Sequence, residues 1–172
     1  MDAVAIFEGW HEFYFLLGTS AAGLTGLMFV VVSISPETIA TRPHAGIRAF
    51  VTPIVVYFTS VLLISGAMMA PHPSAALLAT LLALGALAGI AYMLWIDVHR
   101  QWRVSELEWD DWAWYCALPL AGYLVLLVGA IALWMRSASA VLAIALSCVL
   151  FVVVGIRNGW DLALWMARRR RP

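Results

Sequence analysis

Apolar stretches without a single charged residue alternate with short polar segments along the whole chain. Asp, Glu, Lys, Arg and His are absent from residues 13–36, 49–71, 73–96, 112–135 and 137–156. A helix rises 1.5 Å per residue, so roughly 20 apolar residues cross the hydrocarbon core of a bilayer. The pattern therefore predicts an all-α integral membrane protein with five transmembrane helices, over about 13–36, 49–70, 74–96, 112–135 and 137–156.

The polar segment over residues 97–111 is the only sizeable one between two of these spans. Trp95, Val98, Trp102, Trp109 and Trp112 fall close to one stripe at helical spacing, with charged residues between them. This arrangement predicts a short interfacial helix between the third and fourth spans. Its charged side is expected to be solvated, or to meet a partner.

The composition agrees with a membrane protein. Hydrophobic residues make up 64% of the chain and charged residues 12%, whereas about a quarter of the residues in a soluble domain are charged. Five spans use most of the 172 residues, so we expect one transmembrane domain over 1–172 and no separate soluble domain.

Arginine is distributed very unequally between the two sides of the predicted bundle. Alternating the loops leaves Arg136 as the one arginine on the side of the N-terminus. The other nine lie on the opposite side: Arg42, Arg48, Arg100, Arg103, Arg157, Arg168, Arg169, Arg170 and Arg171. Short loops rich in arginine stay in the cytoplasm. The count predicts an external N-terminus, and a basic cytoplasmic tail over 157–172 whose last four arginines attract anionic lipid headgroups.

Small residues recur at helical spacing in two spans. Gly18, Ala22 and Gly26 are four residues apart, and Gly85 and Gly89 form a second such pair. Small side chains let a neighbouring helix approach closely, so these are candidate helix-packing residues. The first set, beside the hydroxyls of Thr19, Ser20 and Thr25, fits packing within one protomer, a subunit interface or the lining of a cavity. The second pair is a candidate for dimerisation.

Pro119 lies well inside the fourth span. It removes the hydrogen bond to the carbonyl of Tyr115, so the sequence predicts a kink between Tyr115 and Pro119.

The last span leads into the most specific polar motif of the chain. Arg157 and Asp161 are four residues apart with Asn158 beside them, and Arg157 follows about 30 Å of apolar helix. One interpretation is an anchor at the membrane boundary, in which Arg157 pairs with Asp161 and Asn158 bonds to a neighbouring helix. The other is a polar pocket facing the cytoplasm, which Arg48 or Arg100 would complete.

Candidate chemistry beyond this interfacial site is sparse. Glu8, His11 and Glu12 are suitable ligand types, but a carboxylate-bridged metal bundle needs a second such motif and none follows, so no metal and no cofactor are expected. Asp97 and His99 have no nucleophile at a fixed spacing, and no catalytic residue is predicted. Proton relays and voltage sensors carry ionisable groups inside the membrane, which these spans lack.

FYFLLGTSAAGLTGLMFVVVSISPE near the start and GIRNGWDLALWMA near the end resemble the two ends of a loose group of small, uncharacterised multi-span proteins of bacterial inner membranes. The resemblance implies an inner-membrane location but no activity, substrate or cofactor. We expect a structural or regulatory component that associates with itself or with a membrane partner, with no nucleic-acid partner. The alternatives are a channel or transporter for a small neutral solute, and an enzyme acting on a lipid-like substrate at the cytoplasmic interface.

Overall fold

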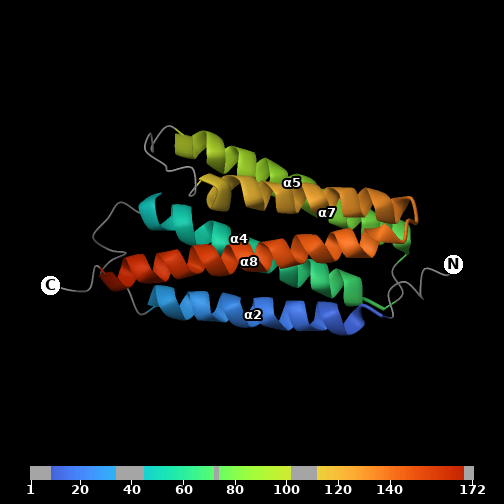
Figure 1. Ribbon diagram of the computed structural model, residues 1–172, viewed down its shortest axis with the longest axis horizontal. Coiled ribbons are helices and arrows are strands. Elements are labelled where there is room, and N and C mark those ends of the chain that lie inside the picture. Colours follow the sequence, from blue (N-terminus) through green and yellow to red (C-terminus); the bar gives the residue numbers. More distant parts are fainter. Residues whose placement is uncertain (1–8, 34–44, 72–73, 102–111, 169–172) are drawn as a thin grey trace.

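The computed structural model describes residues 9–33, 45–71, 74–101 and 112–168, and every regular element in these ranges is a helix (Figure 1). The elements are α2 (His11–Ser33), α4 (Ala45–Met69), α5 (Ala75–Gln101), the π-helical turn η1 (Ala113–Ala117), α7 (Leu118–Trp134) and α8 (Ser139–Arg168). Five helices are long and apolar enough to cross a membrane, η1 and α7 forming one of them. The predicted all-α, five-span architecture is confirmed.

Two predicted boundaries differ from the observed helices. Residues 97–101 continue α5, and 102–111 lie outside the described residues, so the described part contains no separate interfacial helix after the third span. At the other end, α8 continues through 157–168, where the sequence predicted a tail. Its 30 residues give a helix of about 45 Å, roughly 15 Å longer than the hydrocarbon core.

The helices form two hairpins that the last helix joins. α2 packs along α4, and α5 packs along α7, while α8 packs against both α4 and α7 (Figure 1). α4 and α5 follow one another in the chain but share few contacts. The boundary between the hairpins therefore runs between α4 and α5.

Aromatic rings from one helix fill the space above glycines of another in the core of the bundle. A Cβ at Gly122 of α7 would lie 2.7 Å from the ring of Phe151 on α8, and one at Gly155 of α8 would lie 2.5 Å from the ring of Phe58 on α4. Helices gain no hydrophobic driving force from one another inside a lipid bilayer, so close packing of this kind holds them together. These two glycines therefore fix α8 against α4 and α7.

The turn between α7 and α8 ends α7 with a left-handed residue. Arg136 has φ 57°, its N–H donates to the carbonyl of Leu133, and the N–H of Ser137 donates to that of Ala132. This hydrogen-bond pattern defines a Schellman motif, in which glycine usually takes the left-handed position. A tight turn results, and α8 returns along α7.

A π-helical turn occupies the region where the sequence predicted a kink. The N–H of Leu118 donates to the carbonyl of Ala113, five residues earlier, instead of to that of Trp114. A wider turn accommodates the ring of Pro119, which would otherwise crowd the carbonyl of Tyr115. The irregularity is therefore a local widening of the helix just before the proline.

Candidate functional site

Two side chains near the end of α8, Arg157 and Asn158, contact Trp114 of η1, and Asp161 pairs with Arg157. Arg157 forms an ion pair with Asp161 one turn later, and both side chains are partly exposed. The guanidinium carbon of Arg157 also lies 5.8 Å from the centre of a Trp114 ring, within the range of a cation–π interaction. We call Trp114, Arg157, Asn158 and Asp161 the α8 polar cluster.

Asn158 is the buried member of the α8 polar cluster. Only 1% of its surface is exposed, and its Nδ2 donates a hydrogen bond to the backbone carbonyl of Trp114 over 3.5 Å. In a π turn that carbonyl would pair with the N–H of residue 119, which is a proline and has none. The amide of Asn158 thus supplies the donor that Pro119 cannot. Among the described residues, its Oδ1 has no hydrogen-bond partner.

The geometry of the α8 polar cluster bears on the two interpretations of the motif. Arg157 pairs with Asp161, and Asn158 bonds a neighbouring helix, as the anchor interpretation expected. Residues 48 and 100 belong to α4 and α5, but the positions of their side chains lie outside the described residues. A pocket completed by Arg48 or Arg100 therefore stays a prediction.

Trp114 was not among the site residues predicted from the sequence, although its spacing from Pro119 carries a signal. Pro119 follows Trp114 by five residues, so a π-type hydrogen bond from the carbonyl of residue 114 would need an N–H that the proline lacks. The sequence predicted a kink between Tyr115 and Pro119, and the π turn overlaps this region, but spacing alone does not say which distant side chain supplies the donor.

The small residues of the first span point in more than one direction. A Cβ at Gly18 would lie 3.0 Å from the Cβ of Ser65 on α4, so Gly18 packs inside the bundle. Ala22 and Gly26 are exposed, and none of the described side chains or backbone lies within 4 Å of a Cβ at Gly26. Each step of four residues turns a helix by about 40° beyond one full turn. The three positions therefore drift from the α4 contact to the surface of the bundle.

Gly85 and Gly89 of α5 also have different surroundings. A Cβ at Gly89 would lie 2.1 Å from the ring of Tyr123 on α7, which occupies the space above this glycine. In the part of the chain that the structure describes, nothing lies within 4 Å of a Cβ at Gly85. The predicted pair is thus split into one intramolecular contact and one open position.

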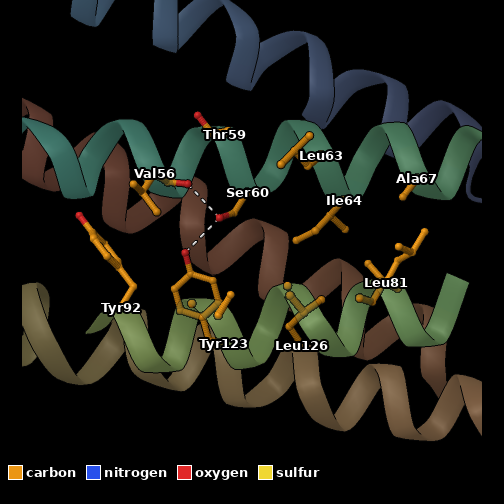
Figure 2. A pocket seen from close by; sticks show the side chains of 14 residues that line it. Val56, Thr59, Ser60, Leu63, Ile64, Ala67, Leu81, Tyr92, Tyr123 and Leu126 are labelled. Carbon is orange, nitrogen blue, oxygen red and sulfur yellow. Dashed lines mark hydrogen bonds between the residues drawn. The ribbon is translucent and has the colours of Figure 1, made fainter. Parts of the chain in front are cut away.

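The open position belongs to a groove between α4 and α5. The groove has a volume of about 590 Å³, and side chains of α7 lie at its base (Figure 2). Most of its lining is aliphatic, including Leu63 of α4 and Leu81 of α5. Four lining residues carry hydroxyls: Thr59, Ser60, Tyr92 and Tyr123. It lies along the boundary between the two hairpins, where α4 and α5 share few contacts.

A chain of hydrogen bonds runs along the α4 side of the groove. The hydroxyl of Ser60 donates to the carbonyl of Val56 over 2.9 Å, and the oxygens of Ser60 and Tyr123 are 3.0 Å apart. A serine hydroxyl has only one proton, so Tyr123 is the donor in the second bond. Figure 2 shows the Tyr123 hydroxyl pointing across to Ser60. Neither residue stood out in the sequence, because hydroxyls scattered through an apolar span, such as those of Tyr57, Thr59, Ser60 and Ser65 on α4, carry no pattern.

Metal-ligand types do not gather anywhere in the described part of the chain. No three His, Cys, Asp or Glu residues there lie close enough to hold an ion. His11 and Glu12 lie exposed at the start of α2, and Glu8 lies outside the described residues.

Comparisons with models of protein families, with curated proteins and with solved structures give no match for this chain.

Proposed function

We propose that this protein is a non-catalytic, multi-pass component of the bacterial inner membrane that acts by associating with a second copy of itself or with another membrane protein. The arginine distribution supports an external N-terminus and a cytoplasmic C-terminus. The resemblance of the two ends of the chain to small inner-membrane proteins supports the same location. The observation that carries the proposed association is the outward side of α2.

Four small residues form what we call the outer face of α2: Thr19, Ala22, Gly23 and Gly26. All four are exposed, and no atom of the described residues lies within 4 Å of a Cβ at Gly23 or Gly26. α2 makes most of its contacts with α4, so this face has no neighbour in the described part of the bundle. Faces of this kind allow two helices to approach closely in a bilayer.

The exposed side of α5 differs from the outer face of α2. On α5 the exposed small residues Thr80, Ala88 and Ala91 are interrupted by Leu84 and Leu87, both more than half exposed. On α2 the large exposed side chains come before and after the four small residues: Phe15, Leu16, Leu27, Phe29 and Val30. Large aliphatic side chains are suited to lipid chains and hold a second backbone at a distance. The contrast favours α2 as the helix that meets another protein.

The test is to enlarge the outer face of α2 and measure association in lipid. Ala22→Leu and Gly26→Leu point into open space, so the bundle keeps its fold while a second helix is kept away. Ala91→Leu, at an exposed position of α5, is the matched control. Single-molecule photobleaching in liposomes of bacterial lipid counts the copies per particle. We expect the first two variants to be monomeric, and the unchanged chain and the control to be oligomeric.

If the unchanged chain is monomeric in lipid, the proposed association is with another membrane protein. Cross-linking in the native membrane, with a photoreactive residue in place of Thr19, then detects that partner. If no adduct forms at this position and the unchanged chain is monomeric, the proposed association is wrong.

The channel alternative has less support. It relied on Thr19, Ser20 and Thr25 facing a polar path, yet Thr19 is on the outer face of α2 and the hydroxyl of Thr25 donates to the carbonyl of Ala21 in its own helix, over 2.8 Å. An enzyme at the interface would depend on Arg48 and Arg100 joining the α8 polar cluster.

A further inference from the structure

We propose that the groove between α4 and α5 binds an uncharged, lipid-like molecule through a hydroxyl group held near the middle of the bilayer. Its walls carry Leu63, which is 65% exposed, and Leu81, which is 54% exposed. Both lie on spans that cross the hydrocarbon, so the groove opens toward lipid and not toward water. An amphiphile dissolved in the membrane can therefore reach it directly.

The size of the groove fits a small molecule and excludes a helix. Its volume of about 590 Å³ lies inside the usual range of about 300–1,000 Å³ for small-molecule sites. A transmembrane helix is roughly 10 Å wide and 30 Å long, which amounts to more than 2,000 Å³. A second copy could insert a few side chains at most, whereas an acyl or isoprenoid chain can lie within the groove.

The hydrogen bonds of the groove specify what its polar end accepts. Tyr123 donates its proton to Ser60, and Ser60 donates its own to Val56. Both protons are therefore committed, and the Tyr123 oxygen keeps capacity to accept one more hydrogen bond. The group that completes this chain is a donor, namely an alcohol or a phenol. A ketone, ester or ether would find no proton to accept at the Ser60–Tyr123 pair. The hydroxyls of Thr59 and Tyr92 also line the groove but are not part of this pair.

The depth of these hydroxyls excludes charged headgroups. Ser60 lies eight residues from one end of the apolar window Thr52–Met69 and nine from the other, or about 12–14 Å from each. Tyr123 is equally central in Ala113–Trp134. Phospholipid headgroups stay at the interface, and a charge at this depth is costly without a partner. The ligand is therefore neutral, as isoprenoid alcohols, quinols and diacylglycerols are.

Two glycines of α5 make the site possible. Gly89 leaves the space in which the ring of Tyr123 crosses toward α4, and Gly85 leaves the groove open beside it. This assigns the two glycines to a ligand site inside one protomer. The proposal does not depend on association through α2, because α2 contributes no residue to the lining.

The test uses the full chain in lipid nanodiscs and a pair of photoreactive probes. The first is a sixteen-carbon primary alcohol with a diazirine in its chain, and the second is its methyl ether, which cannot donate. We expect the alcohol to label peptides of α4, α5 and α7 about 5- to 10-fold more than the ether does, the ratio that one neutral hydrogen bond supplies. Competition by an unlabelled isoprenoid alcohol, quinol or diacylglycerol then ranks the natural sources.

Matched variants separate the site from general lipid contact. Tyr123→Phe keeps the ring and removes the acceptor, while Tyr14→Phe removes a buried hydroxyl that bonds Val141 away from the groove. Gly85→Leu fills the groove, and Gly66→Leu adds the same side chain in open space outside its lining. We expect the first member of each pair to lose the preference for the alcohol and the second to keep it.

Three results would overturn the proposal. The ether could label the groove as strongly as the alcohol does, Tyr123→Phe and Gly85→Leu could both leave labelling unchanged, or a photoreactive residue at position 85 could cross-link to a second copy in place of lipid. Loss of association in the α2 variants would affect none of these readouts.

Discussion

At the scale of single residues, Asn158 joins two helices through one buried amide. Asn158→Ala removes the donor to the Trp114 carbonyl, and we expect a loss of about 1–2 kcal/mol in the free energy of unfolding. Ser147→Ala is the control, because this buried hydroxyl donates only within its own helix, to Ile144, and leaves no other helix without a partner. Reversible unfolding in mixed micelles measures both. Equal losses would contradict the role given to Asn158.

Gly89 and Gly85 offer a second comparison of single residues on one helix. Gly89→Ala places a Cβ against the ring of Tyr123, which must shift, and we expect a loss of about 1–3 kcal/mol. Gly85→Ala meets nothing, so the better helix propensity of alanine should stabilise α5 by up to about 1 kcal/mol. The same unfolding measurement gives both values. A neutral Gly89→Ala would show that the ring moves freely.

The sequence identified Arg157, Asn158 and Asp161 as neighbours but not Trp114. Spacing along a helix predicts which side chains share a face, and the Arg157–Asp161 ion pair follows from it. The contact with Trp114 spans 44 positions of the chain and depends on how α8 lies beside η1. The same holds for Ser60 and Tyr123, whose hydrogen bond requires the packing of α4, α5 and α7 to be known.

At the scale of the elements, the π turn and Asn158 should depend on one another energetically. Pro119→Ala restores an N–H at residue 119, which can donate to the Trp114 carbonyl or return the turn to the α-helical register. The Asn158 amide would then matter less. We expect Asn158→Ala to cost about 0.5–1 kcal/mol less in the Pro119→Ala background, as measured by a double-mutant cycle in mixed micelles. Strict additivity would mean that the proline and the amide act independently.

The ends of the elements were the least predictable part of the fold. Hydropathy places a span to within a few residues, but a helix continues past the hydrocarbon wherever its polar residues tolerate helical geometry. α8 does so to Arg168, and α5 does so to Gln101. In the sequence, the α7–α8 turn is visible only as a short connection between two spans. Its left-handed position is occupied by Arg136 and not by glycine, so the residue type does not reveal the turn.

For the molecule as a whole, the arginine count predicts an orientation that reporter fusions can measure. A fluorescent protein fused after Pro172 should fluoresce, and alkaline phosphatase at the same place should be inactive. Replacing Arg168, Arg169, Arg170 and Arg171 with alanine should leave the orientation unchanged. Five arginines would still lie on the predicted cytoplasmic side, against Arg136 alone on the other: Arg42, Arg48, Arg100, Arg103 and Arg157. An active phosphatase on the unchanged chain would show that the orientation is the opposite of the predicted one.

The number and length of the apolar stretches were sufficient to predict the five-helix architecture, because a bilayer allows few other solutions. The arrangement of the helices was not predictable in this way. Nearly every face of every span is apolar, so hydropathy does not say which faces meet. Glycines that hold an aromatic ring, such as Gly122 and Gly155, decide this, and they look like any other glycine in the sequence.

The position of α8 between the two hairpins has a consequence for how the chain is made. Helices enter the membrane in the order of synthesis, and α2–α4 and α5–α7 can each pair as soon as their second member is inserted. Until α8 leaves the ribosome, the two pairs share few contacts, among them the Ser60–Tyr123 hydrogen bond. Chains stopped before Ser139 should therefore be two loosely held hairpins that membrane proteases recognise, and stable protein should accumulate only from complete translation.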